Sequence, residues 1–442
     1  MRTNDAGVGR RREPGTANVW EKHAWPERPR PGSGTFILAI VSAQVLTQIG
    51  AFALPALLPG HIARWHLSGT EAGWLVGSFF AAYVAAVPAL LAMTDRLPVR
   101  LVFLTGAALT EVSQPGFALV ADGFWSGLVL RAIAGVGWAG ACMPGLKAIA
   151  DPLEGVEQSR AVSMHAAGVA VSGAASFMVA GLPRAVAGPS AAFLFGAAAA
   201  AGAFVIAVWV MPAALPARAG APPSAGLLDF RPVFRNRAAL AWIIGYTVHT
   251  WELAALRAWG VTFLTVAIAR QGAPEWLPGP TVPFTVAGPA GIAVSVTGNE
   301  LARRFGRFHV VILAIGGAAL LSLVAGWGAA VSAPLAAALV GLWNATIYLD
   351  SSALTAGTVA AADRHSRGAT MRLHSMAGYA GGFLGPLGVG LILDLAGRDT
   401  LIGWGLGFGH LAVVTLVGLA ALRWMARSRQ PSRGANVVAL PK

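Results

Sequence analysis

The chain has 442 residues, of which 56% are hydrophobic and only 12% are charged, and its mean hydropathy is +0.63. Soluble domains carry about 25% charged residues, so this composition argues against a water-soluble globular protein and predicts one that crosses a membrane repeatedly. The formal net charge of +13 raises the question of a nucleic-acid partner, which the placement of the basic residues answers.

Residues 1–35 precede the first apolar run and contain the polar segments "GRRREPG" and "PERPRPG". A Pro-rich composition of mixed charge is typical of disordered segments, so we predict a disordered tail here. The apolar run that follows is too long for a signal peptide, and no small-residue cleavage pattern follows it.

Apolar runs of about 20 residues, long enough to cross about 30 Å of hydrocarbon, recur along the rest of the chain. We predict about twelve spans, at residues 36–58, 71–93, 100–120, 125–149, 162–182, 191–213, 238–267, 283–302, 308–329, 333–361, 371–396 and 400–424. The Pro- and Arg-rich stretch after the sixth span predicts a linker between two half-domains. The predicted domains are a tail (1–35), an N-terminal six-helix bundle (36–213), a cytoplasmic linker (214–237), a C-terminal six-helix bundle (238–424) and a second tail (425–442).

The basic residues lie mostly on one side of the predicted membrane. When successive loops are assigned to alternate sides, roughly 26 of the 32 Lys and Arg residues fall on the side of the two tails. Cytoplasmic loops carry such an excess, so both termini are predicted to be cytoplasmic. The excess charge orients the protein in the membrane, and we expect no nucleic-acid partner.

Two loops carry short motifs of a known kind. The loop after span two reads "LAMTDRLPVR", in which Asp95, Arg96 and Arg100 match an acidic and two basic positions of a G-x-x-x-D-R-x-G-R-R signature. The corresponding loop after span eight, "NELARRFGRF", keeps Arg304 and Arg307. Leu91 and Pro98 stand where this signature has glycine, so the turn after span two departs from the pattern.

Two spans and a repeat add to these motifs. Span four reads "RAIAGVG", similar to an R-x-x-x-G-x-G pattern that begins at Arg131, and span eleven contains "GGFLGPLGVG", similar to a glycine–proline motif of antiporters. The segments "RAVSM" at Arg160 and "RGATM" at Arg367 precede spans five and eleven, as a parallel repeat would place them. Over roughly residues 36–424 the chain therefore resembles the major facilitator superfamily.

This resemblance implies a fold and a set of functional residues. The implied fold is an all-α membrane protein of twelve transmembrane helices in two pseudo-symmetric six-helix bundles, which rock around a substrate site near mid-membrane. The two loop motifs would form a conformational gate, with Asp95, Arg96, Arg100, Arg304 and Arg307. Spans one, four, seven and ten would line the central cavity.

Five ionisable residues lie deep in predicted spans, namely Glu111, Arg131, Glu252, Arg257 and Asp350. Each costs about 2.5–3.5 kcal/mol on insertion scales, so we expect a water-filled cavity or ion pairing to offset the cost. Four of the five lie on spans four, seven and ten. Glu111 is on a peripheral span and Asp394 is near the end of span eleven, and their roles stay open.

Further candidates lie on the spans that would line the cavity. They are Gln44 and Gln48, four residues apart on one helical face, with His249, Trp138, Trp251 and Trp343. We expect Arg131 and Arg257 to bind an anionic group or to tune a nearby acid. Burial penalises the charged form of a carboxyl group, so Glu252 and Asp350 are candidates for the proton-coupling acid, with a structural ion pair as the alternative. The tryptophans favour an aromatic, amphipathic or cationic organic solute over a small inorganic ion.

Together these features predict a secondary active transporter of a small organic solute, coupled to protons and working by alternating access. A uniporter, an inorganic-anion porter and a non-transporting sensor on the same fold stay open as alternatives. The sequence has no H-E-x-x-H, no G-x-S-x-G and no metal-spaced Cys/His cluster, so we expect no enzyme activity, metal or cofactor. The expected partners are a small-molecule substrate, protons and the lipid bilayer, and the expected state is a monomer.

Overall fold

The computed structural model describes residues 28–213, 229–363 and 365–427, and within these ranges the chain is helical without a strand. The helices are α1 (Gly34–Gln48), α2 (Ala53–Trp65), α3 (Gly69–Met93), α4 (Val99–Leu119), α5 (Phe124–Ala150), α6 (Gly155–Ala187), α7 (Pro189–Val210), α8 (Arg231–Arg235), α9 (Arg237–Gln271), α10 (Val282–Phe305), α11 (Arg307–Gly328), α12 (Ala333–Ala361), α13 (Arg367–Ala396) and α14 (Leu401–Arg427).

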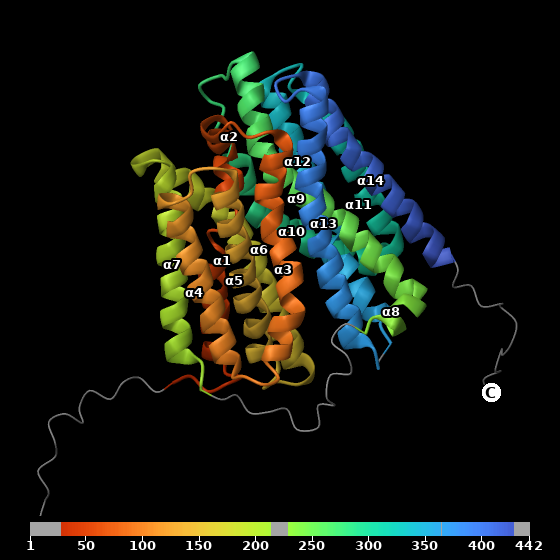
Figure 1. The fold of residues 1–442 in the computed structure, drawn as a ribbon. Helices are drawn as coiled ribbons and strands as arrows, with labels where there is room; N and C mark the ends of the chain where they lie inside the picture. Colours follow the sequence, from red (N-terminus) through yellow and green to blue (C-terminus); the bar gives the residue numbers. More distant parts are fainter. Residues whose placement is uncertain (1–27, 214–228, 364, 428–442) are drawn as a thin grey trace, which may run out of the picture.

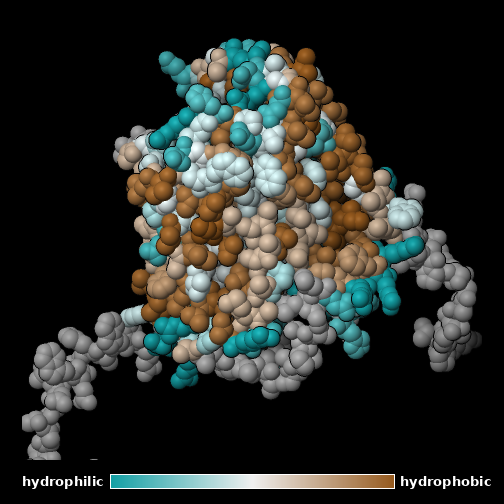
Figure 2. Space-filling model, viewed as in Figure 1, coloured by the Kyte–Doolittle hydropathy of each residue, from teal (hydrophilic) through white to brown (hydrophobic). Residues whose placement is uncertain are grey.

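Most of these helices have the length and composition of membrane spans. Among the described residues nine segments are long and apolar enough to cross a membrane, with α1 and α2 counted as one. Helices α4, α10 and α12 occupy three further predicted spans and have 21, 24 and 29 residues, which at about 1.5 Å per residue reaches across the hydrocarbon. The face drawn in Figure 2 is hydrophobic along its middle and hydrophilic at its two ends. The predicted all-α membrane fold is confirmed.

The helices gather in two groups. In Figure 1, α1–α7 lie on one side and α8–α14 on the other, with α3 and α13 next to each other between them. We call these groups the N-terminal half and the C-terminal half. Helix α3 packs against α13, α6 against α10 and α2 against α9, and these contacts join the halves. We call the end of the molecule where α3 begins the Gly69 end, and the end where α3 turns into α4 the Asp95 end.

One predicted span differs in the structure, and part of the predicted domain plan lies outside the described residues. The first span was expected to run unbroken over 36–58, but α1 ends at Gln48, α2 begins at Ala53, and α2 continues to Trp65. Residues 1–27, 214–228 and 428–442, which hold most of the two predicted tails and of the linker, lie outside the described residues. The described end of the linker forms the short helix α8.

Candidate functional site

The break in the first span leaves buried backbone groups without their helical hydrogen-bond partners. Pro55 stands at the third position of α2 and has no N–H to donate to the carbonyl of Ala51 four residues earlier. Nη1 of Arg131 on α5 donates to this carbonyl instead, at 3.2 Å. The backbone N–H of Phe52 donates to Oγ of Ser176 on α6, at 2.7 Å. Side chains from α5 and α6 thus replace the helical hydrogen bonds that the break removes, as the interior of a membrane protein requires.

Arg131 is held inside the N-terminal half. Its side chain is 3% exposed, and its guanidinium carbon lies 4.7 Å from the centre of the Phe79 ring. Among the described residues no carboxylate forms an ion pair with it. The cavity beside it, lined in part by Thr47 and Gln114, has a volume of about 10 Å³, which is room for about one water molecule. Arg131 therefore stabilises the break, and the cavity beside it is too small for a solute.

Gln44 and Gln48 share one face of α1, as expected, and this face is turned to α6 of the same half. Nε2 of Gln44 donates to the carbonyl of His165, at 3.3 Å. Oε1 of Gln48 accepts from Oγ of Ser172, at 3.0 Å. Both glutamines are fully buried, and each keeps one amide atom without a hydrogen-bond partner, Oε1 of Gln44 and Nε2 of Gln48.

The structure brings His249 and Asp350 together. Nδ1 of His249 on α9 and Oδ1 of Asp350 on α12 are 2.7 Å apart, and neither side chain is more than 4% exposed. The ring of Tyr246 lies between two histidines, 5.8 Å from the centre of His249 and 3.9 Å from that of His374 on α13. Nδ1 of His374 is 3.2 Å from Oγ1 of Thr358. Buried titratable side chains on α9, α12 and α13 thus contact one another, through one close imidazole–carboxylate contact and two ring stacks.

Glu252 lies elsewhere, which corrects the expectation that it faces a chamber shared with Arg131. Nε1 of Trp343 on α12 donates to its Oε1 at 2.6 Å, and Oγ1 of Thr415 on α14 donates to its Oε2 at 3.4 Å. Helix α14 is on the far side of the C-terminal half from α3 in Figure 1. Glu252 is therefore enclosed within that half, and the indole of Trp343 holds it there instead of lining a cavity.

Arg257 is the deep charge that faces the opposite half. Nη2 donates to the hydroxyl of Tyr348 on α12. The guanidinium carbon is 4.9 Å from the centre of the Phe52 ring, which belongs to the broken span. A Cβ atom added to Gly173 of α6 would lie 3.3 Å from Nη1, so glycine at this position leaves space for the arginine. Glu252 and Arg257 do not pair, as expected from their separation of about 140° around α9.

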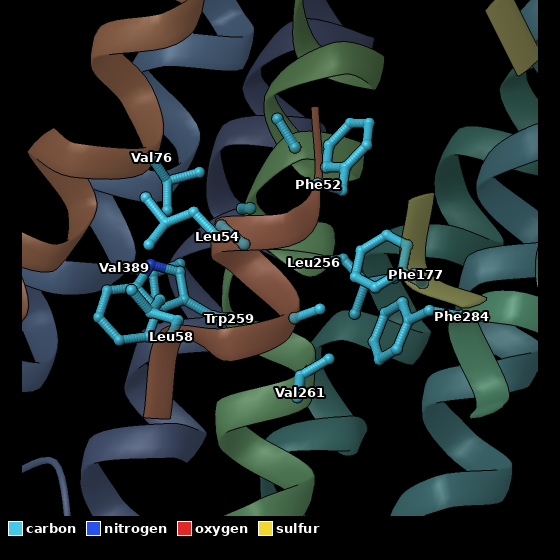
Figure 3. Close-up of a cluster of buried hydrophobic side chains, with 14 of the residues drawn as sticks. Phe52, Leu54, Leu58, Val76, Phe177, Leu256, Trp259, Val261, Phe284 and Val389 are labelled. Carbon is cyan, nitrogen blue, oxygen red and sulfur yellow. The ribbon is translucent and has the colours of Figure 1, made fainter. Parts of the chain in front are cut away.

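Aromatic side chains continue this contact between the halves. The ring of Phe52 stacks on Phe177 of α6 with centroids 5.5 Å apart, and Phe177 stacks on Phe284 of α10 with centroids 5.1 Å apart. Figure 3 shows the three phenylalanines next to each other. On the other side of the interface, Trp138 of α5 lies 5.5 Å from Tyr379 of α13, ring centre to ring centre.

Trp251 is half-buried on α9, and its backbone packs closely against α13. A Cβ atom at Gly385 would collide with the backbone carbonyl of Trp251, so glycine permits the close approach of the two helices. Of the three predicted cavity tryptophans, Trp138 lies between the halves, Trp251 lies between α9 and α13, and Trp343 is bonded to Glu252.

The residues predicted to form a conformational gate contact mainly their own halves. Asp95 pairs with Lys147 of α5 at 2.9 Å, Arg100 donates to the carbonyl of Val208 on α7 at 3.0 Å, and Arg307 donates to the carbonyl of Ala356 on α12 at 3.4 Å. Arg96 is exposed, and the guanidinium of Arg304 lies over the ring of Phe305. Asp95 also lies within electrostatic range of Arg372 on α13, but the two form no ion pair.

Contacts that the sequence reasoning missed join the halves at the Gly69 end. The carboxylate of Asp394 on α13 accepts from the backbone N–H of Gly69 at 2.5 Å and from that of Thr70 at 2.7 Å, and Nη1 of Arg398 donates to the carbonyl of Leu67 at 2.9 Å. Three glycines of α3 lie against α13, where a Cβ atom would meet its backbone or Phe383. They are Gly69, Gly73 and Gly77. Their spacing of four, which places small residues on one helix face, was visible in the sequence.

Comparisons with known proteins agree with this fold. The family model of the Major Facilitator Superfamily matches residues 40–386. A bacterial homologue of the human lysosomal transporter Spinster, crystallised in an inward-facing and occupied conformation, has a similar structure, with a TM-score of 0.68, 16% identity and coverage of 90% of this chain and 98% of that chain. The nucleoside transporter NupG is similarly related, with a TM-score of 0.69, 14% identity and coverage of 89% and 99%. At these identities the structures show a shared fold alone. A search of curated proteins gave no significant match.

Proposed function

We propose that this chain, which belongs to the Major Facilitator Superfamily and is thus a membrane transporter rather than an enzyme, moves a small organic solute by proton-coupled alternating access. The observation that carries the coupling is the buried contact between His249 and Asp350. We further infer that the protein acts as a monomer in the inner membrane. Both of its termini are cytoplasmic in this proposal, because most basic residues lie on their side of the membrane.

The contact between His249 and Asp350 has the properties of a proton site. A carboxylate in a membrane span is costly unless it is neutralised, either by a proton of its own or by a protonated partner. Histidine is the side chain that takes up a proton most readily near neutral pH. The pair connects α9 with α12, so gain or loss of a proton changes the attraction between these two helices.

Glu252 is the second candidate for the coupling acid, and its surroundings argue for a structural role. Its two hydrogen bonds come from side chains of its own half, and a carboxyl oxygen accepts these bonds whether or not the group is protonated. A proton bound there would change no contact between the halves. We therefore assign proton coupling to Asp350 with His249.

The contacts between the halves support a state that is closed at the Gly69 end. This end faces away from the cytoplasm in the proposed orientation, so the structure corresponds to an inward-facing or occluded state. The Asp394 carboxylate and the glycines of α3 hold this end together. Opening it requires these contacts to break while the loops at Asp95 and Arg307 approach each other.

Uptake into proteoliposomes tests the proposal with two matched variants. We expect Asp350→Asn to abolish solute accumulation driven by a pH gradient while leaving exchange of solute across the membrane intact. Glu252→Gln keeps the acceptor oxygen for Trp343 and is expected to retain gradient-driven accumulation. Normal accumulation by Asp350→Asn would show that the coupling site lies elsewhere. A protein that binds a solute but shows no flux in either assay would instead be a sensor.

A further inference from the structure

Arg257 is a charged residue at mid-span without an acidic partner. It is the twenty-first of 35 residues in α9, and among the described residues no carboxylate lies within ion-pair distance of it. The two acids nearest to it along α9 and α12 are engaged, Glu252 with Trp343 and Asp350 with His249. A cation in a membrane span without a counter-charge is costly, so we infer that Arg257 has another partner for part of the transport cycle.

The guanidinium group has donors to spare. Its five N–H groups lie in a planar fork that matches a carboxylate or phosphate, and the hydroxyl of Tyr348 accepts from one of its nitrogens. The side chain is partly exposed, in contrast to the fully buried Arg131. Arg257 can therefore bind a further acceptor without losing its contact with Tyr348.

The surroundings of Arg257 come from both halves. Phe52 of the N-terminal half lies under the guanidinium, and Tyr348 of the C-terminal half holds it from the side. The phenylalanine stack of Phe52, Phe177 and Phe284 continues from this point across the interface. A charged group next to a row of aromatic rings suits a ligand with an acidic end and an apolar body.

Arg131 does not provide an equivalent site. Its Nη1 donates to the carbonyl of Ala51, the ring of Phe79 covers it, and the cavity beside it holds about 10 Å³. The two arginines contact adjacent residues of the broken span from different sides, Arg131 at Ala51 and Arg257 at Phe52. Of the two, Arg257 lies at the interface between the halves and is the more exposed.

We propose that Arg257 binds the acidic group of the transported solute, and that this solute is an organic anion whose apolar part packs beside Phe52, the aromatic ring next to the guanidinium. This inference rests on the proposed transport function and names its substrate class. Because the site is shared between the halves, a ligand bound there contacts both of them. It would be released when the halves move apart on one side.

Thermal unfolding of the purified full-length protein tests the assignment. The probes are a panel of aliphatic and aromatic carboxylic acids, each paired with its primary amide, with sodium nitrate as an inorganic anion. We expect at least one acid, but not its amide, to raise the Tm of the wild type. In Arg257→Gln the concentration that gives half of this shift should rise by about tenfold to a hundredfold, the range for losing a hydrogen bond to a charged group.

Two further variants make the result specific. Arg270→Gln removes the same charge from an exposed position on α9 and should respond as the wild type does. Arg257→Lys keeps the charge but not the planar fork, so it should respond between the wild type and Arg257→Gln, and it carries the test if the glutamine variant does not fold.

Several results would overturn the assignment. These are equal shifts for acids and amides, an undiminished shift in Arg257→Gln and Arg257→Lys, a shift with nitrate alone, or no stabilising acid in the panel. A neutral or cationic ligand that stabilises the protein and enters proteoliposomes would remove the anion class while leaving transport intact. An acid that binds through Arg257 but is never transported would support the anion site while contradicting its role in transport.

Discussion

Asp394 on α13 caps the first turn of α3 in the opposite half, with its carboxylate oxygens 2.5 Å from the backbone nitrogen of Gly69 and 2.7 Å from that of Thr70. The first N–H groups of a helix have no partner within the helix and carry a partial positive charge. A carboxylate at this place therefore satisfies two donors and stabilises the contact electrostatically. Because the contact crosses between the halves, its strength bears directly on whether the Gly69 end stays closed.

Removal of this carboxylate should open the Gly69 end more often. Asp394→Ala removes two hydrogen bonds to a charged group, each worth at most about 1.5–3 kcal/mol net of the exchange with water, because Asp394 is exposed. A reporter cysteine at Val389, which is fully buried on α13 five residues before Asp394, should then react at least about fivefold faster with a membrane-impermeant thiol reagent. The buried Cys142 is first replaced by serine. The control is Asp399→Ala, whose side chain is exposed, and equal labelling in both variants would argue against a gate at Asp394.

The glycines of α3 should also be required for closure. A Cβ atom at Gly73 would lie 2.7 Å from the carbonyl oxygen of Pro386 and 2.9 Å from Cα of Leu387, so Gly73→Ala pushes α3 away from α13. We expect this variant to label at Val389 faster and to transport more slowly. Gly316→Ala on α11 meets no atom within 4 Å and should behave as the wild type. Unchanged labelling in Gly73→Ala would show that α3 and α13 tolerate a wider spacing.

The contribution of the hydrogen bond between Arg131 and the Ala51 carbonyl to the free energy of unfolding should depend on Pro55. Arg131→Met leaves this buried carbonyl without a donor, which costs about 1–3 kcal/mol. Pro55→Ala supplies a backbone N–H at the position from which a regular helix would satisfy it. In a double-mutant cycle on the free energy of unfolding, Arg131→Met should therefore cost about 1 kcal/mol less in the Pro55→Ala background. Pro88→Ala in α3 is the control, and its effect should add to that of Arg131→Met. Additive effects for Pro55→Ala would mean that the missing N–H of Pro55 is not the reason why the Ala51 carbonyl needs Arg131.

Much of the fold could be predicted from the sequence because lipid imposes a strong constraint on it. Long apolar runs fix the spans, and the matching motifs in the two halves indicate the repeat and the family. The break at residues 49–52 was not predicted, because Gly50 and Pro55 lie within an apolar run whose hydropathy does not change there. Hydropathy reports burial in lipid, whereas the break depends on which backbone groups find a donor.

The candidate site was predicted less completely, for a physical reason. Most of the candidate residues on spans one, four, seven and ten are buried, but burial does not say which neighbour a side chain meets. Asp350 meets His249, whereas Glu252, only three residues from His249, turns to Trp343 and α14. Asp394 was left open because its partners are backbone groups of α3, 324 and 325 residues away. A contact of this kind leaves no pattern in the side chains.

Distances between spin labels at the two ends of the molecule test alternating access most directly. One pair joins Arg64 on α2 with Glu275 after α9 at the Gly69 end, and the other joins Arg96 after α3 with Arg367 on α13 at the Asp95 end; all four residues are exposed. In a Cys142→Ser background, Asp394→Ala should lengthen the first distance and shorten the second. Asp350→Asn should change the balance between the same two states. Distances that stay fixed at both ends, or that lengthen together, would contradict a transporter that opens to one side at a time.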